Sequence, residues 1–332
     1  MDEKIKISLS KDTLELLKKD CLDFKIVKAD GKANMNSFIN TLIANFYESF
    51  AAGEETLHED LKNALAAVPE YYREKVFLQT LKVITKRTEG TGEKKDSAIL
   101  SFKPTKVSEM ARLYVESILI PSESLSSFYR RMFTAYAQKT KNEREKIIHK
   151  EALLLLQKAI KRGVQVCVQL QNGDVLQKLS VHSIPSSKEE LFNYVLFYNG
   201  KNNVTIRLAS VQSVALLSQT AFMPEENRAM FDRQVACAPQ YPIYSTDNEP
   251  IKVQLTEKGK KLFEKIYLYR PTPVSIDGDI YTFNCSANQL IYYFERFGDS
   301  ALIISPRKLG IYMRNYYHFA LKKYKTIYNG QN

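Results

Sequence analysis

The chain has 332 residues, enough for two or three small domains, and its 44% hydrophobic residues suit a folded protein with real cores. The formal net charge of +11 indicates a basic surface that attracts phosphate backbones or acidic lipids, although no helix has the strongly basic amphipathic pattern that favours a membrane surface. No apolar run approaches the roughly 20 residues of a membrane-spanning helix, and the first residues lack the apolar segment of a signal peptide.

The first predicted element is a strand over residues 4–9, in which polar and apolar residues alternate. The apolar face consists of Ile5, Ile7 and Leu9. A helix capped by Ser10 follows, and a second helix begins near Asn34. Because a lone strand leaves unpaired backbone groups on both edges, we expect a two-fold dimer in which two such strands pair as an antiparallel ribbon.

The strand-helix-helix order of residues 1–50 resembles the ribbon-helix-helix family. The resemblance implies a dimerisation domain whose outward strand residues enter the major groove of DNA, and in this chain those residues are Lys4, Lys6 and Ser8. The alternative interpretation is that these residues form an ordinary solvated strand face. The sequence favours dimerisation and leaves both interpretations of the strand face open.

Residues 51–160 are predicted to form a helical connector. Helical spacing runs through residues 55–87 and again between residues 107 and 162, with a polar, glycine-bearing linker at residues 88–96. A short apolar run at residues 98–102 lies between the linker and the later helices.

From Val164 the hydrophobic pattern changes from helical to alternating. Five short strands are predicted within residues 161–222, with Asn-Gly turns at Asn172-Gly173 and Asn199-Gly200. Five strands in so short a segment indicate a small SH3-like or Sm-like barrel. Residues 224–250 are expected to be a loop.

The motif at residues 193–211 resembles that of WYL domains. These domains are named after a Trp-Tyr-Leu triplet, which is followed by a strand of the form Phe-Arg-Leu-Asp-Arg-Ile. This chain has Asn-Tyr-Val at residues 193–195 and Ile-Arg-Leu-Ala-Ser-Val at residues 206–211. The tyrosine and the first arginine are kept as Tyr194 and Arg207, whereas the tryptophan and the second arginine are replaced.

The WYL resemblance implies a binding site for RNA or a nucleotide-like ligand at Tyr194, Arg207 and Lys201. An aromatic ring stacks on a base, and an arginine pairs with a phosphate through two hydrogen bonds. The alternative is that Tyr194 packs in the barrel core and Arg207 makes an internal salt bridge.

Residues 250–328 are predicted to form a second α+β unit with the order β-α-β-β-α-β and a long final helix, which is a ferredoxin-like plan. Segments 297–301 and 305–309 resemble the C-terminal extension that commonly follows WYL domains. The final helix interleaves lysines and arginines with tyrosines, a pattern that suits a single-strand nucleic-acid surface. A tyrosine-rich helix packed on a sheet, with lysines outside, would give the same pattern.

Residues that carry metal or redox chemistry are few and scattered. The cysteines are Cys21, Cys167, Cys237 and Cys285, without a CxxC pair, and no two histidines stand at ligand spacing. Nucleotide-binding glycine motifs and the GxSxG motif are also missing from the sequence. We therefore expect reduced thiols in a cytoplasmic protein that is not an enzyme and needs no metal or cofactor.

The whole arrangement is that of an α+β multidomain protein and is similar to the WYL-family accessory proteins of type VI-D CRISPR systems. This resemblance implies a homodimer that binds single-stranded RNA and stimulates the ribonuclease activity of its partner, an RNA-guided CRISPR effector. The alternative is a DNA-binding transcriptional regulator in which the ribbon reads an operator and the barrel senses a ligand. A structural adaptor without a nucleic-acid partner is a third interpretation.

Overall fold

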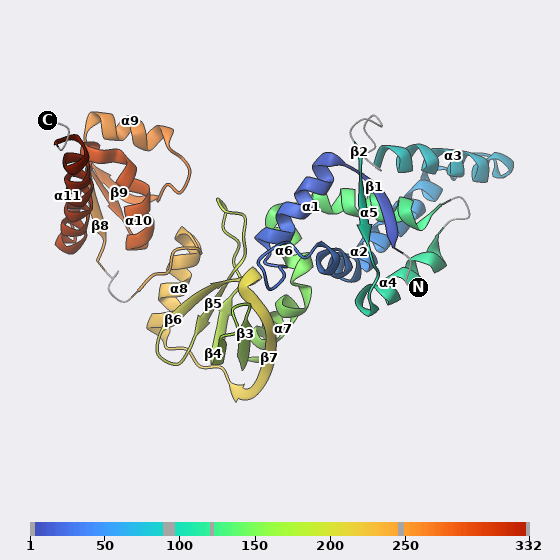
Figure 1. Ribbon diagram of the computed structural model, residues 1–332, viewed down its shortest axis with the longest axis horizontal. Coiled ribbons are helices and arrows are strands. Elements are labelled where there is room, and N and C mark those ends of the chain that lie inside the picture. The colour runs from blue at the N-terminus through green and yellow to red at the C-terminus, as the bar shows by residue number, and fades with distance from the viewer. Residues whose placement is uncertain (1–3, 89–96, 120–122, 245–248, 330–332) are drawn as a thin grey trace. The chain divides into compact units, whose positions relative to one another are not determined.

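The computed structural model describes residues 4–88, 97–119, 123–244 and 249–329. The chain divides into two compact units, Met1–Leu154 and Leu155–Asn332 (Figure 1). Both units mix helices with strands, and the described residues form three antiparallel sheets. The predicted α+β class is thus confirmed, whereas most of the predicted linker, residues 89–96, lies outside the described residues.

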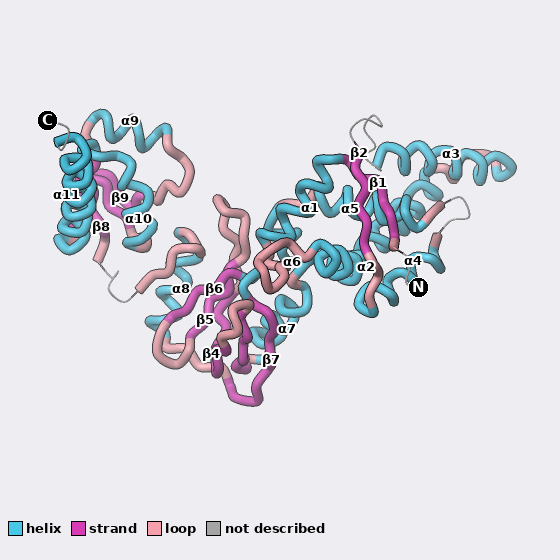
Figure 2. The backbone as a smooth tube through the Cα atoms, viewed as in Figure 1, coloured by secondary structure: helices cyan, strands magenta, loops and turns pink. Residues whose placement is uncertain are grey.

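The first unit consists of helices packed around a two-stranded sheet (Figure 2). Its strands are β1 (Ile5–Ser10) and β2 (Ser97–Phe102). Its helices are α1 (Lys11–Asp23), α2 (Met35–Ala64), α3 (Glu70–Thr88), α4 (Lys106–Ile118), α5 (Leu125–Ala137) and α6 (Lys141–Ile148), and α7 (Lys150–Arg162) leads into the second unit. The domain boundary expected at residue 50 is wrong, because α2 continues through it and packs against α4, α5 and α6.

Strand β1 pairs with β2 of the same chain, from Ile5 opposite Phe102 to Ser10 opposite Ser97. The expectation that β1 has no strand partner within the chain is therefore wrong. The carbonyl oxygens of Lys6 and Ser8 also accept hydrogen bonds from side chains of α5, at 3.4 and 2.9 Å. Backbone groups that a ribbon between two chains would use are thus bonded within this chain, whereas homodimerisation itself stays a prediction.

The local sequence signals of the first two helices are confirmed. Ser10 Oγ accepts a hydrogen bond from the backbone N–H of Thr13, as predicted for a cap. The second helix begins near Asn34 as predicted, and the Asn34 side chain caps it by accepting a hydrogen bond from the N–H of Ser37. The alternation in β1 places Ile7 and Leu9 in the core.

A buried ion pair joins α1 to α6. Arg144 donates from Nε and Nη2 to the two carboxylate oxygens of Asp20, at 2.6 and 3.1 Å. The hydroxyl of Tyr136 in α5 donates to the same carboxylate at 3.0 Å. Three hydrogen bonds therefore compensate for the burial of this carboxylate.

The second unit begins with the five predicted strands, which form one antiparallel sheet in the order β6-β5-β4-β3-β7. They are β3 (Val164–Leu170), β4 (Val175–Ser183), β5 (Tyr194–Tyr198), β6 (Asn203–Arg207) and β7 (Val211–Thr220), with a 3-10 turn, η2 (Leu208–Ser210), before β7. Gly173 and Gly200 have positive φ angles of 91° and 87°, as the predicted Asn-Gly turns require. The loop expected at residues 224–250 is wrong in part, because it contains the helix α8 (Glu225–Cys237).

The rest of the second unit, hereafter the C-terminal lobe, follows the predicted element order. Its strands β8 (Ile251–Leu255), β9 (Pro273–Asp277), β10 (Ile280–Phe283) and β11 (Ala301–Ser305) pair in the order β11-β8-β10-β9. Its helices are α9 (Glu257–Lys265), α10 (Ala287–Phe294) and α11 (Arg307–Asn329), with a 3-10 segment, η4 (Glu295–Ser300), after α10. The core joins one sheet face to α9 and α10 through aromatic rings, including Phe263, Phe283, Tyr293, Phe294 and Phe297.

Candidate functional site

Helix α8 crosses the outer face of the β5–β6 hairpin and is fixed to it by three buried side chains, Asn227, Phe231 and Gln234. These residues are one helical turn apart and therefore share a face. Asn227 exchanges two hydrogen bonds with Asn203 in β6, at 3.0 and 3.1 Å, and Gln234 Nε2 donates to Thr205 Oγ1 at 2.9 Å. Phe231 completes a small apolar cluster with β5.

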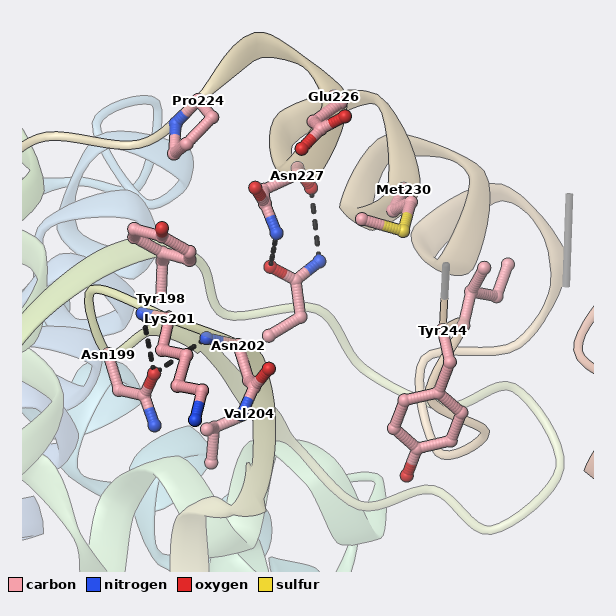
Figure 3. Close-up of a pocket in the computed structure, with 12 residues that line it drawn as sticks. Tyr198, Asn199, Lys201, Asn202, Val204, Pro224, Glu226, Asn227, Met230 and Tyr244 are labelled. Carbon is pink, nitrogen blue, oxygen red and sulfur yellow. Dashed lines mark hydrogen bonds between the residues drawn. The ribbon is translucent and has the colours of Figure 1, made fainter. Parts of the chain in front are cut away.

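A pocket of about 580 Å³ opens between the start of α8 and the β5–β6 turn (Figure 3). Its lining is Tyr198, Asn199, Lys201, Asn202, Asn203, Val204, Pro224, Glu226, Asn227, Met230, Ile243 and Tyr244. The turn is shaped by Asn199, whose Oδ1 accepts from the backbone N–H groups of Lys201 and Asn202 at 3.0 and 2.7 Å. The pocket therefore combines a fixed amide-rich wall with two tyrosines and a lysine.

The chemistry of this pocket suits a small planar molecule with hydrogen-bonding edges. Asparagine side chains present both donors and acceptors, as the edges of nucleobases do. The ring of Tyr244 is 48% exposed and offers a stacking surface, while Lys201 offers an ammonium group to a phosphate.

The structure brings together two of the three predicted barrel residues. Tyr194 and Arg207 are opposite each other in the β5–β6 ladder, and both are half-buried. The Arg207 guanidinium lies over the Phe192 ring, 3.1 Å from its centroid, and the Tyr194 hydroxyl donates to Glu190. Lys201 lies in the turn at the opposite end of the same hairpin, where it lines the pocket instead.

A tyrosine cluster lies close to Glu190. The rings of Tyr241, Tyr269 and Tyr292 have centroid separations of 5.2 to 6.4 Å. Burial is the main cause that raises the pKa of Tyr241 above its ordinary value, and the charges of Glu190 and Glu189 act in the same direction. Burial also raises the pKa of Tyr269, so the phenols of Tyr241 and Tyr269 are neutral hydrogen-bonding groups at neutral pH.

His182 in β4 lies under α8, between a serine and an aspartate. Its Nδ1 is 2.8 Å from Ser183 Oγ, its Nε2 is 3.2 Å from Asp232 Oδ1, and its ring packs against Phe231. Burial lowers the pKa of His182, with Asp232 acting in the opposite direction. None of these four residues lines the pocket, and the described part of the chain holds no cluster of His, Cys, Asp or Glu suited to a metal ion.

The residues predicted for DNA contact lie in the first unit. Lys6 and Ser8 are exposed on β1, and Lys4 is exposed just before it. The paired strand β2 exposes Ile99 and Ser101 on the same face, because Ile99 is opposite Ser8 and Ser101 is opposite Lys6.

Sequence reasoning missed most of the pocket. Asn227 and Tyr244 fall in the segment expected to be a loop, and Asn202 and Asn203 were not identified as candidate site residues. The available signal was the concentration of three asparagines within residues 199–203, more than a two-residue hairpin turn needs.

No protein-family profile matches this chain, and no curated protein matches it. Among solved structures, it is similar to a crystal structure of a CRISPR Cas-related protein, with a TM-score of 0.69 and 18% identity over 99% of this chain and 95% of that chain. The chain therefore shares the fold of that protein over nearly its whole length. Proteasome accessory factor B/C (PafBC) of Arthrobacter aurescens gives a TM-score of 0.25 and 16% identity, over 69% of this chain and 39% of that chain. Across the described residues, no helix combines the length and apolar character needed to span a bilayer.

Proposed function

We propose that this chain is an accessory protein of a CRISPR system that binds single-stranded RNA and stimulates the ribonuclease activity of an RNA-guided type VI-D effector. The observation that carries the proposal is the likeness of fold to a CRISPR Cas-related protein over nearly the full length of both chains. The net charge of +11 supports a polyanionic partner.

The five-stranded sheet supplies groups suited to an RNA strand. The pocket offers amides for base edges, and Tyr194 with the stacked Arg207 offers a flat surface and a cation at the other end of the hairpin. In this proposal the protein cleaves nothing, and it raises the concentration of RNA at the partner nuclease.

The test is fluorescence anisotropy of the protein with single-stranded RNA and with duplex DNA, combined with an assay of effector cleavage with and without the protein. We expect preference for RNA and a fivefold or greater loss of affinity in Arg207→Ala and Tyr194→Ala, about the effect of one lost stacking contact. Lys161→Ala, which removes an exposed lysine of α7, is the control. Unchanged effector cleavage would contradict the accessory role.

The second candidate is a ligand-sensing, DNA-binding regulator, which the exposed lysines of the β1–β2 ribbon favour. A two-stranded ribbon fits the major groove, and here both strands come from one chain. Under this alternative, Lys4→Ala with Lys6→Ala abolishes duplex binding and leaves RNA binding unchanged. Duplex DNA binding that survives this double substitution would exclude the alternative.

A further inference from the structure

Helix α11 (Arg307–Asn329) carries six of the 48 Lys and Arg residues of the chain and no acidic residue, so its net charge of +6 is large beside the +11 of the whole chain. Residues 301–332 contain six basic residues and no Asp or Glu, against a net charge of +11 for all 332 residues. The six are Arg307, Lys308, Arg314, Lys322, Lys323 and Lys325. A helix with this charge attracts a polyanion.

One face of α11 fixes the helix to the C-terminal lobe. Gly310 lies against β11 so closely that an added Cβ would be 2.7 Å from the carbonyl oxygen of Ile303. Met313 is buried, and the hydroxyl of Tyr317 donates to the carbonyl of Glu295 at 3.0 Å. These residues follow the i, i+3, i+7 spacing of a single helical face.

A second face of α11, about 120° around the helix axis, carries large rings that are exposed. Tyr312 is 53%, Tyr316 44% and Phe319 64% exposed, and Lys323 extends the same row. The spacing i, i+4, i+7, i+11 aligns these four residues along one stripe, hereafter the α11 stripe. Lys308 and Lys322 lie on the side of the stripe that is away from the lobe, by the helical period.

We propose that the α11 stripe is a second contact site for single-stranded RNA, with bases stacked on the three rings and the backbone phosphates facing the lysines. The inference rests on the proposed RNA-binding function and deepens it. Exposed rings in a row beside cations match an unpaired strand, whose bases are free to stack. The bases of a duplex are already stacked on one another, so a duplex can interact with the lysines through its phosphates but cannot stack on the three rings.

The first experiment measures affinity for single-stranded RNA at several salt concentrations. Tyr312→Ala with Phe319→Ala removes two rings, and we expect affinity to fall about tenfold or more. Lys323→Ala is expected to reduce the slope of log affinity against log salt by about 0.7, as for one lost phosphate contact to a single strand. The matched control is Lys325→Ala, which removes the same charge from another side of the helix and leaves affinity near the wild-type value.

The second experiment reports contact directly. Because the chain contains no tryptophan, Phe319→Trp places a single indole on the α11 stripe. RNA that stacks there changes its emission, whereas Leu321→Trp, on the opposite side of the helix, stays unchanged. All the substituted residues are exposed, so the variants are expected to unfold at the wild-type temperature.

The outcomes separate this inference from the proposed function. If Arg207→Ala weakens RNA binding while the α11 stripe variants bind as wild type, the inference is overturned and the RNA-binding function stands. If the stripe variants keep RNA but lose binding to phosphatidylserine vesicles, the surface belongs to a membrane and the inference is again overturned. A chain that binds no RNA overturns both.

Discussion

The buried carboxylate of Asp20 depends on its hydrogen-bond partners. With 0% exposure, it is compensated by Arg144 and by the hydroxyl of Tyr136. Arg144→Met keeps much of the side-chain volume but leaves the carboxylate without its cation. We expect the free energy of unfolding to fall by about 3–5 kcal/mol, measured by urea denaturation.

The control for that prediction is the ion pair between Lys141 and Asp23. Its Nζ–Oδ2 distance is also 2.6 Å, but both side chains are partly exposed. Lys141→Ala is expected to cost less than about 1 kcal/mol, because solvent screens the pair. Equal losses in the two variants would show that burial of Asp20 does not determine the cost.

His182 makes stability depend on pH. Its pKa in the folded protein is lowered by burial, so protonation favours the unfolded chain. Its contribution is present above the ordinary histidine pKa of about 6.5 and is lost as pH falls from there toward the folded value. We expect the stability difference between the wild type and His182→Gln to shrink as pH falls from about 7.5 to about 5, and a constant difference would contradict this.

Single residues were predicted well where the chemistry is local. The cap at Ser10 and the helix start near Asn34 each depend only on a neighbour three residues away, and the structure has both. Ser286 is the N-cap residue of α10 and has Gln289 three residues later, the spacing of a capping box, but its hydroxyl donates to the carbonyl of Pro242 at 2.8 Å. A residue more than forty positions earlier cannot be anticipated from a local motif.

At the scale of elements, α9 packs closely against the backbone of η4 because Gly259 has no side chain. An added Cβ at Gly259 would be 2.1 Å from the carbonyl oxygen of Ser300, a backbone atom that cannot move freely. We expect Gly259→Ala to lower the free energy of unfolding by about 1–3 kcal/mol or more. Gly53→Ala in α2, with no atom within 4 Å of the added Cβ, is expected to stabilise by about 0.8–1 kcal/mol.

Strands were easier to predict than the helix that covers them. Alternating residues and Asn-Gly turns identified the five strands of the second unit, because each signal lies within the strand or turn itself. Helix α8 was missed because two of its three buried residues, Asn227 and Gln234, are polar and gave no apolar stripe. Asn203 and Thr205 in the sheet accept hydrogen bonds from these two side chains, which compensates for their burial. The pocket depends on α8 and was missed with it.

For the whole molecule, homodimerisation stays a prediction. Because β1 is paired with β2 and hydrogen-bonded by α5, we expect its interface elsewhere, on α4, where Val107, Met110 and Tyr114 share a face and are 63%, 71% and 44% exposed. Light scattering is expected to give twice the chain mass of 38.2 kDa for the wild type. Met110→Glu places a charge on this apolar face, and the variant is expected to have the mass of one chain. Tyr71→Glu, at an 88% exposed site on α3, is the control.

The order of elements was predicted correctly where strands that pair lie close together in the sequence, and wrongly where they do not. The lobe at residues 250–328 closes on itself, so its order followed from the pattern. The first unit instead closes through β2, which lies beyond α3 and was interpreted only as a short apolar run in a connector. No local pattern in residues 1–50 indicates that distant partner.

The pairing of Ile5–Ser10 with Ser97–Phe102 also has a consequence for biosynthesis. During translation, β1 leaves the ribosome long before β2 is synthesised, because the helices α1, α2 and α3 lie between the two strands in the sequence. Until then the apolar face of Ile7 and Leu9 has no sheet to join, which exposes the nascent chain to aggregation or to chaperones. On a ribosome stalled before residue 97, β1 is therefore expected to be unpaired and sensitive to protease. On a ribosome stalled well beyond residue 154, β1 is expected to be paired with β2 and protected.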